Sequence, residues 1–204
     1  MGKVIVYEWM TLDGVVQAPG ASDEDASGGF RHGGWHLQFF DDMSRSSVLK
    51  NLTDAGGFLL GRHTYEGFAS HWPSASEEEQ PLAQPLNAKP KYVASTTLRE
   101  PLEWENSTLL QGDVASAVTS LKARAPGDLL VIGSAQLTRH LFENDLVDEV
   151  RLMIDPILVG GGKRAFPDSG PVTRLRLVEC QSTTTGALLV KYVRDGQGPG
   201  GKHA

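Results

Sequence analysis

Apolar residues fall into short runs along the chain, and polar, glycine-rich segments separate them. The first run, over residues 3–9, alternates around β-branched side chains and predicts a strand. A segment rich in Gly, Asp and Ser follows. We expect a mobile loop over residues 10–34, because irregular segments this long are uncommon inside a domain and usually serve a function. Apolar side chains recur at helical spacing from about Trp35 to Leu52, which predicts a helix. The run GGFLLG predicts a buried strand, after which a helix should begin near Arg62.

The second half of the chain alternates more regularly. We expect helices beginning at Asp113 and Ser134, and strands at residues 91–95, 108–111, 128–133, 147–154, 174–180 and 187–193. Residues 73–90 have the composition of a polar loop punctuated by prolines. The run DLLVIG is continuously apolar, as in a parallel strand covered on both faces, and the last two strands are close enough to form an antiparallel hairpin.

These patterns together predict one α/β domain over residues 1–194. Its central sheet should be mostly parallel, with an antiparallel edge hairpin near the C-terminus and helices flanking the sheet. Residues 195–204 have nothing to bury and should form a disordered tail.

Composition places the chain among ordinary globular proteins. Of its 204 residues, 40% are hydrophobic and 22% are charged, which suffices for one substantial core. The net charge of −6 offers no general basic field for nucleic acid or an anionic membrane. The single cysteine, Cys180, excludes an intrachain disulfide, and its place in a predicted strand favours a core position. Without a signal-peptide pattern or a membrane-spanning run, we expect a cytoplasmic protein with no nucleic-acid or membrane partner.

The clearest candidate chemistry follows the GGFLLG strand. Gly61 ends this strand, and Arg62, His63 and Thr64 occupy the expected start of the next helix. A helix N-terminus carries unpaired N–H groups and a partial positive charge, so it binds phosphate readily. Thr64 adds a hydroxyl donor and Arg62 a guanidinium that pairs with phosphate. The same residues also fit a plain capped helix with an exposed arginine, and their spacing does not separate the two interpretations.

A second strand-to-helix turn lies in LLVIGSAQL. Its small residues, Gly133 and Ala135, let the backbone approach a flat or charged ligand closely. Glycine after a buried strand is often only a turn, but two such turns at the carboxyl ends of strands strengthen each other, because α/β proteins bind ligands there. The glycines of MIDPILVGGGKRAFP lack Walker A spacing, so this segment predicts a flexible hairpin tip or a substrate-gating loop.

One acid stands on the apolar face of the predicted helix. At about 100° per residue, Asp42 falls inside the stripe of Trp35, Phe39 and Met43, whereas Asp41 points away from it. A carboxylate that faces a core is costly unless it is paired or used, which makes Asp42 a candidate functional acid. The alternative is a carboxylate at the edge of the stripe that bonds a nearby backbone group.

Two other chemistries find little support. His32 and His36 are four residues apart, but glycines break the segment between them and no third ligand is evident, so we expect no metal site. The chain also lacks the G-x-S-x-G elbow of a serine hydrolase.

Four segments carry a resemblance to a known family: MTLDGV, LLGRHTYE, LLVIGSAQL and VDEVRLMIDPILVGGGKRAF. GRHTYE after a buried strand resembles the phosphate-binding turn of dihydrofolate reductases. The whole set, in this order from about residue 3 to residue 193, is more similar to the C-terminal reductase domain of the bacterial riboflavin-pathway deaminase-reductase. No deaminase domain with its zinc signature precedes the match, so the chain resembles a free-standing member.

The resemblance implies a dihydrofolate reductase-like fold, with NADPH lying across the carboxyl ends of the strands. The implied cofactor-binding residues are Gly61, Arg62, His63, Thr64, Ser95, Thr96, Gly133, Ser134, Ala135 and Leu12. Residues 11–14 resemble the start of a mobile loop that closes over the nicotinamide. The implied substrate loop consists of Thr11, Gly14, Gly161 and Gly162. Sheets of this family often pair between subunits, so the resemblance also implies a homodimer.

The resemblance therefore predicts an NADPH-dependent reductase that transfers hydride to a small pterin-, pyrimidine- or ribityl-type substrate. Dihydrofolate reductases carry their substrate-binding acid in the helix before GRHTYE. Asp42 is the nearest candidate, although its spacing to Gly61 is not a clean match, and Asp13 would assist from the loop. Two alternatives stay open, a non-catalytic nucleotide-binding module of the same fold and an authentic dihydrofolate reductase. Arg62 suggests NADPH, but the sequence does not decide between NADPH and NADH.

Overall fold

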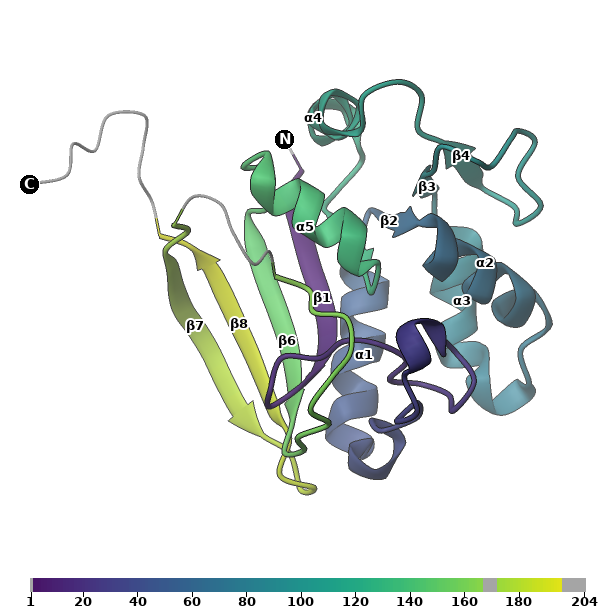
Figure 1. Ribbon diagram of the computed structural model, residues 1–204. Coiled ribbons are helices and arrows are strands. Elements are labelled where there is room, and N and C mark those ends of the chain that lie inside the picture. Colours follow the sequence, from purple (N-terminus) through teal and green to yellow (C-terminus); the bar gives the residue numbers. More distant parts are fainter. Residues whose placement is uncertain (1, 167–171, 196–204) are drawn as a thin grey trace, which may run out of the picture.

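The predicted apolar runs form the strands of one eight-stranded sheet in the computed structural model, which describes residues 2–166 and 172–195 (Figure 1). The strands lie side by side in the order β4-β3-β2-β5-β1-β6-β8-β7. Their bounds are β1 Val4–Thr11, β2 Gly57–Gly61, β3 Lys91–Ala94, β4 Ser107–Leu109, β5 Leu129–Ile132, β6 Glu149–Asp155, β7 Leu175–Ser182 and β8 Leu188–Arg194. The α/β fold and the edge hairpin are confirmed.

Strand direction places the carboxyl ends of six strands at one edge of the sheet. All pairings among β1 to β6 are parallel, and only β6 with β8 and β8 with β7 pair antiparallel. In the β1–β6 register Thr11 lies beside Asp155, the last residue of each strand. Loops that follow these strands therefore converge at one edge, as in other α/β ligand sites.

Alternation along β1 supplies both faces of the core. Val4 and Val6 belong to the apolar cluster that contains residues of α4 (Val114–Arg124) and α5 (Ala135–Glu143). Ile5 and Tyr7 belong to the cluster on the opposite face, with residues of α1 (Asp42–Asp54), α2 (Arg62–His71) and α3 (Gln80–Ala88). Each fully buried large apolar side chain contributes roughly 1.5–3 kcal/mol, so the two clusters fix the sheet between the helical layers.

Helix α1 begins seven residues later than the apolar pattern predicts. The N-cap is Asp41, whose carboxylate accepts a hydrogen bond from the Ser44 N–H at 2.9 Å. Trp35 is buried in the preceding loop, where its indole N–H donates to the Gln17 carbonyl at 2.8 Å. Trp35 therefore packs in the loop before the cap, and the predicted start of the helix at Trp35 is wrong.

Helix α3 lies where a loop was expected. Pro81 falls in the first turn, where a helix has no use for its missing N–H. Pro85 lies inside the helix and lacks only the N–H that would bond back to the carbonyl of Pro81. The short 3-10 helices η3 (Trp72–Ser74) and η4 (Glu77–Glu79) precede α3, and a Ser76–Glu79 capping box starts η4.

The loop between β1 and α1 is folded around a buried glutamine and includes the 3-10 helices η1 (Ser27–Gly29) and η2 (Leu37–Phe39). The Gln17 amide donates to the carbonyls of Asp25 and Ser27, both at 3.0 Å. The predicted mobility of residues 10–34 stays a prediction. Residues 196–204 of the predicted tail lie outside the described residues. Cys180 is exposed on β7, so its expected core position is wrong.

Candidate functional site

The two strand-to-helix turns meet at the carboxyl ends of β2 and β5. The Gly61 N–H donates a hydrogen bond to the Ser134 hydroxyl at 2.9 Å, and that hydroxyl lies 3.0 Å from the Thr64 hydroxyl. A Cβ on Gly133 would lie 3.5 Å from the Thr64 hydroxyl, so the second turn lies against the Thr64 side chain. Gly133 and Ser134 have φ values of 54° and 60°, in the left-handed region. Glycine adopts this conformation at little cost, whereas Ser134 adopts it with a side chain.

The start of α2 lacks a side-chain cap and carries two basic side chains. Its N-cap is Gly61, which has no side chain to satisfy the first N–H groups. The Arg62 guanidinium pairs with Glu66 at 3.1 Å and also lies 3.1 Å from the His63 Nε2. Ala135 is the first residue of α5, beside this turn. Unsatisfied N–H groups and adjacent basic side chains are the donors that bind phosphate at helix N-termini.

Ser95 and Thr96 continue this edge of the sheet after β3. Gly61 and Ala94 are register partners, so Ser95 follows β3 beside the α2 turn. The Ser95 hydroxyl accepts hydrogen bonds from the N–H groups of Thr97 and Leu98, at 3.1 and 3.0 Å, and Thr96 is exposed. This places both predicted residues next to the start of α2.

Asp13 ties the loop after β1 to the glycine segment after β6. Its carboxylate accepts from the Thr11 hydroxyl at 2.6 Å and from the N–H groups of Gly160 and Val159 at 2.8 and 3.3 Å. The Thr11 hydrogen bond, together with these backbone bonds, holds the pKa of the Asp13 carboxyl below its usual value. In this structure Asp13 positions a loop, and its predicted catalytic assistance stays a prediction.

The predicted substrate loop is brought together by the same contacts. The Val16 N–H donates to the Lys163 carbonyl at 2.9 Å, and Gly162 is packed so that a Cβ would lie 2.7 Å from Val15. A Cβ on Gly14 would lie 3.0 Å from the Arg164 guanidinium. Gly161 has open space around it, and Leu12 is 63% exposed.

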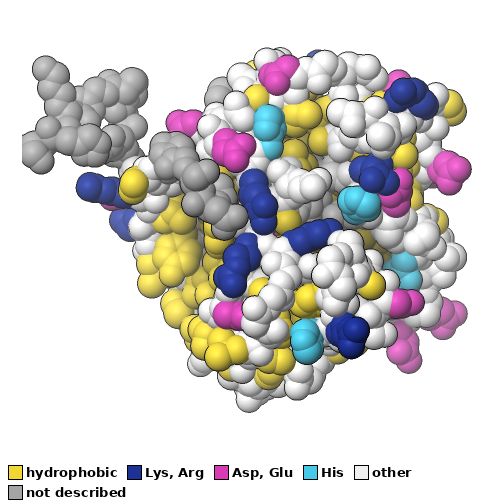
Figure 2. Space-filling model, in the orientation of Figure 1, with side chains coloured by type: hydrophobic (Ala, Val, Ile, Leu, Met, Phe, Trp, Pro, Cys, Tyr) yellow, Lys and Arg dark blue, Asp and Glu magenta, His cyan; other side chains and the backbone are white. Residues whose placement is uncertain are grey.

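Two arginines not identified from the sequence extend the site. The Arg164 guanidinium donates to the Asp13 carbonyl, and the Arg139 guanidinium on α5 donates to the Arg164 carbonyl at 2.6 and 2.9 Å. Lys and Arg side chains gather in the middle of this face (Figure 2). Arg139 stands one turn into the helix that LLVIGSAQL opens, a position that would have identified it as a candidate.

A second cluster of polar side chains, His36 and Asp155, lies across β1 from the joined turns. The Asp155 carboxylate is 2.7 Å from the His36 Nδ1, and both side chains are fully buried. Burial raises the pKa of the Asp155 carboxyl, and the contact with His36 opposes that rise. Sequence reasoning considered His36 only as a metal ligand and overlooked Asp155. An acid directly after the apolar run of residues 152–154 was the available signal.

Glu8 is a further buried acid, on the α5 side of β1. It is 2% exposed, and its carboxylate accepts from the Thr138 hydroxyl at 3.2 Å. Burial raises the pKa of Glu8 well above its usual value. A carboxyl so placed is kept protonated over a wider pH range than an exposed one.

Asp42 does not lie on a buried stripe. It is exposed at the first position of α1, and the prediction that it faces the core is wrong because the helix starts only there. Its neighbour Asp41 is used instead, capping α1 and accepting from the N–H and hydroxyl of Thr184 in the β7–β8 turn. These bonds, the Thr184 hydroxyl foremost, lower the pKa of Asp41.

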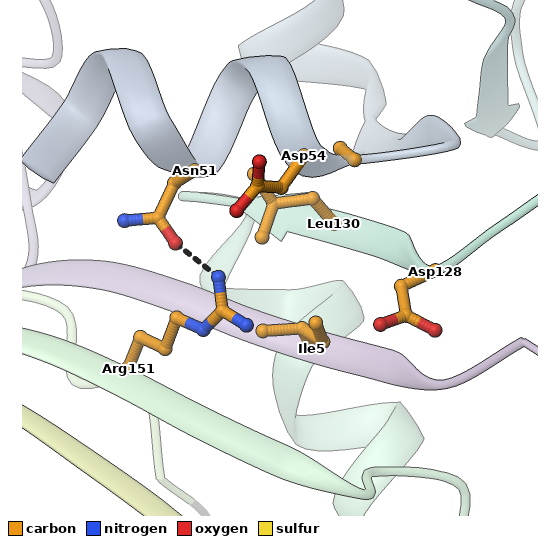
Figure 3. Close-up of a pocket in the computed structure, with 7 residues that line it drawn as sticks. Ile5, Asn51, Asp54, Asp128, Leu130 and Arg151 are labelled. Carbon is orange, nitrogen blue, oxygen red and sulfur yellow. Dashed lines mark hydrogen bonds between the residues drawn. The ribbon is translucent and has the colours of Figure 1, made fainter. Parts of the chain in front are cut away.

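A small pocket lies at the other end of the sheet, between α1 and the sheet (Figure 3). Its volume is about 20 Å³, which holds a single water. It is lined by Ile5, Asn51, Asp54, Ala55, Asp128, Leu130 and Arg151. The Arg151 guanidinium already bonds Asn51 and Glu149, so this pocket is not a candidate for the site. Residues 2–166 and 172–195 contain no cluster suited to a metal ion and no helix of a length and apolarity that would cross a membrane.

Comparison with known proteins gives a consistent result. The model of the RibD C-terminal domain family matches residues 2–189. The uncharacterized protein YyaP of Bacillus subtilis (strain 168) is 28% identical over 154 residues, which cover 74% of this chain and 79% of YyaP.

Two crystal structures share the fold, each with a TM-score of 0.67. A putative riboflavin biosynthesis protein from Shewanella sp. PV-4 is 20% identical, and the match covers 96% of this chain and 100% of that one. A pyrimidine reductase-like protein from Corynebacterium diphtheriae is 13% identical, with 96% and 93% covered. At these identities the two structures support the fold alone.

Proposed function

The chain belongs to the RibD C-terminal domain family, and on that premise we propose that it is an NADPH-dependent reductase. Its substrate would be a small pterin- or pyrimidine-type heterocycle or a ring-opened ribityl relative. The family match supports this substrate class, and a pyrimidine reductase-like protein shares the fold. The cofactor, when bound, supplies the hydride, and the protein contributes binding and orientation.

The joined turns carry the proposal. Gly61, Thr64 and Ser134 bring the uncapped start of α2 and the start of α5 to adjacent strand ends. Two helix N-termini side by side suit a ligand with two phosphates, and Gly133 leaves room for it to approach the backbone. These residues fit a nicotinamide dinucleotide. Arg62 and His63 would meet its adenosine-side phosphates, and Ser95 and Thr96 would follow along the edge.

The loops after β1 and β6 would then cover the nicotinamide end. Asp13 and Arg164 hold them together, and Arg139 attaches them to α5, the helix that follows the second turn. Leu12 offers an exposed apolar side chain on the same loop. We assign Asp13 to positioning this cover, which excludes water from the reacting ring.

We also propose that the chain forms a homodimer through β7, the edge strand. All of Leu175–Ser182 is exposed, and Figure 2 shows hydrophobic side chains gathered over β7 and β8. Two β7 strands paired antiparallel about a point between Leu177 and Val178 would set Arg176 against Glu179 of the second copy. Such pairing would also satisfy the free backbone groups of the edge.

A turnover screen tests the reductase assignment. Oxidation of NADPH is followed at its absorbance maximum in the presence of pterins, pyrimidines with and without a ribityl chain, and quinones. Turnover with a pterin or pyrimidine is expected. Tight cofactor binding without turnover on any compound would favour the non-catalytic module, and turnover of dihydrofolate with inhibition by antifolates would identify an authentic dihydrofolate reductase.

A further inference from the structure

Trp9, His36 and Asp155 meet at the carboxyl ends of β1 and β6. Trp9 and Thr11 lie on the same face of β1, and Asp155 is the register partner of Thr11. The indole and the carboxylate therefore share the face that α1 covers, and Trp9 packs against the apolar cluster there. His36 reaches them from the loop that precedes α1. The position is one strand away from the joined turns, because β1 lies between β5 and β6.

The His36 imidazole makes the contacts that a small flat ligand would make. It stacks on the Trp9 indole, with ring centroids 4.1 Å apart and an interplanar angle of 23°. Its Nδ1 is 2.7 Å from the Asp155 carboxylate, and the Phe40 ring stands edge-on at 5.4 Å. A nitrogen heterocycle held by one aromatic face and one carboxylate is a common form of ring recognition.

The cluster leaves three buried polar atoms without a hydrogen-bond partner in the described part of the chain. They are the Trp9 Nε1, the His36 Nε2 and the Asp155 Oδ1. Such atoms are uncommon in proteins and costly where they occur. A histidine–aspartate pair that served only to anchor the loop would not require an unpartnered indole N–H or a free carboxylate oxygen beside it. The His36 imidazole therefore satisfies only some of the hydrogen-bonding atoms of Trp9 and Asp155.

The segment that carries His36 belongs to a loop, anchored by the buried Trp35 and by backbone hydrogen bonds. The His36 N–H donates to the Pro19 carbonyl at 3.2 Å, and the Gly34 N–H to the Ala18 carbonyl at 2.8 Å. The next residues, Leu37 and Gln38, are exposed. Displacement of His36 would therefore rearrange this loop and leave the strands and the long helices intact.

We infer that Trp9 and Asp155 form the ring-binding end of the substrate site, and that the His36 imidazole holds the place of the ring until a substrate displaces it. The ring is a flat nitrogen heterocycle whose face stacks on Trp9. A ring N–H and an adjacent amino group donate to both oxygens of Asp155, as an ionised carboxylate accepts two parallel hydrogen bonds. The inference rests on the proposed function and specifies that the substrate carries neighbouring N–H donors, as aminopyrimidine and pterin rings do.

The test uses 2-aminopyrimidine as the probe and tryptophan fluorescence as the readout, in the full chain. His36→Ala should bind the probe about tenfold more tightly than wild type, because the tethered competitor is removed. Adding Asp155→Asn should weaken that binding by about tenfold, because hydrogen bonds to a charged acceptor are lost. His32→Ala, an exposed histidine of the same loop, is the matched control and should behave as wild type. Equal affinity in His36→Ala and wild type would overturn the inference.

A measurement on the wild type covers the case in which His36→Ala does not fold. Exchange of the His36 C2 proton, followed by mass spectrometry, should be slow in the free protein and faster at saturating probe, whereas His32 should not respond. Unchanged protection of His36 at saturating probe would contradict displacement. An NADPH titration of the same samples separates the two proposals. Cofactor binding without a probe effect counts against the ring site alone. A probe effect without cofactor binding supports the ring site and counts against the reductase.

Discussion

The Ser134 hydroxyl accepts a hydrogen bond from the Gly61 N–H at 2.9 Å and lies 3.0 Å from the Thr64 hydroxyl. One side chain thereby joins two turns that are 73 residues apart in the sequence. The two helix N-termini are held in place before any ligand arrives, so binding a dinucleotide need not order them. The proposed cofactor site depends on this contact.

Ser134→Ala removes the contact without adding bulk. We expect stability to fall by about 1 kcal/mol, the usual contribution of one hydrogen bond, and the Kd for NADPH to rise about tenfold as the turns separate. Urea unfolding and a fluorescence titration measure the two effects. Ser120→Ala is the matched control, because the Ser120 hydroxyl donates to the Ser116 carbonyl on the exposed face of α4. An unchanged NADPH affinity in Ser134→Ala would show that the turns bind the cofactor independently or not at all.

Arg62→Ala should distinguish the two nicotinamide cofactors. If the guanidinium meets the 2′-phosphate, the Kd for NADPH should rise by roughly tenfold to a hundredfold and that for NADH should hardly change. Lys50→Ala is a suitable control, because Lys50 pairs with Asp54 as Arg62 pairs with Glu66, four residues along an exposed helix face. Equal losses for both cofactors would place Arg62 elsewhere on the ligand.

Asp13→Asn should loosen the glycine segment after β6. The side-chain amide keeps one acceptor oxygen, so one of the N–H groups of Val159 and Gly160 loses its partner. We expect faster amide exchange at these two residues and a raised KM for the substrate. Because the folded-state pKa of Asp13 is lowered, the carboxylate bonds persist above its unfolded pKa and are lost as the pH falls through the folded value. Exchange in the wild type should approach that of the variant only in acid, and Asp23→Asn should match the wild type.

Glu8→Gln should change how stability depends on pH. The folded-state pKa of Glu8 is raised, so the folded protein binds this proton more tightly than the unfolded chain does. That contribution is fully present below the unfolded pKa and is lost as the pH rises toward the folded value, by up to about 1.4 kcal/mol per pH unit. The neutral variant should therefore gain stability relative to wild type as the pH rises from the unfolded pKa of this carboxyl toward its raised folded-state pKa. Urea midpoints at several pH values measure this, and Glu78→Gln, an exposed acid, should show no such gain.

Leu177→Lys should dissociate the proposed homodimer. The side chain lies 49% exposed on β7, and in the proposed pairing the new cation would lie against Val178 of the second copy, where burying a charge is costly. Size-exclusion chromatography with light scattering should give a dimer for the wild type and a monomer for the variant. Leu37→Lys, at a position 60% exposed on η2, should stay dimeric. A monomeric wild type would contradict the proposed homodimer.

The sheet and the two strand-to-helix turns followed from local sequence. FLL and LLVI are continuously apolar, and each is followed by a glycine and a helical pattern, so β2, β5 and their turns were predictable. The start of α1 was not, because Trp35 supplies apolar periodicity whether it packs in a helix or in a loop. The capping pair Asp41 and Ser44 was the better signal.

The substrate side of the site could not be derived from spacing. His36 and Asp155 are 119 residues apart, and only the folding of the loop between β1 and α1 against the end of β6 brings them together. Asp42 was chosen because a helix was extended across Asp41, its actual cap. Helix α3 was missed because prolines were read as breakers without regard to their positions in the first and second turns.

The joined turns are tested most directly by titrating the purified protein with NADPH and, separately, with NADH. The chain has four tryptophans, among them Trp9 and Trp35 in or near the proposed site, so energy transfer to the nicotinamide reports binding. Saturable binding that favours NADPH is the result that this account predicts. No binding of either cofactor would leave the fold and family in place and contradict the reductase assignment.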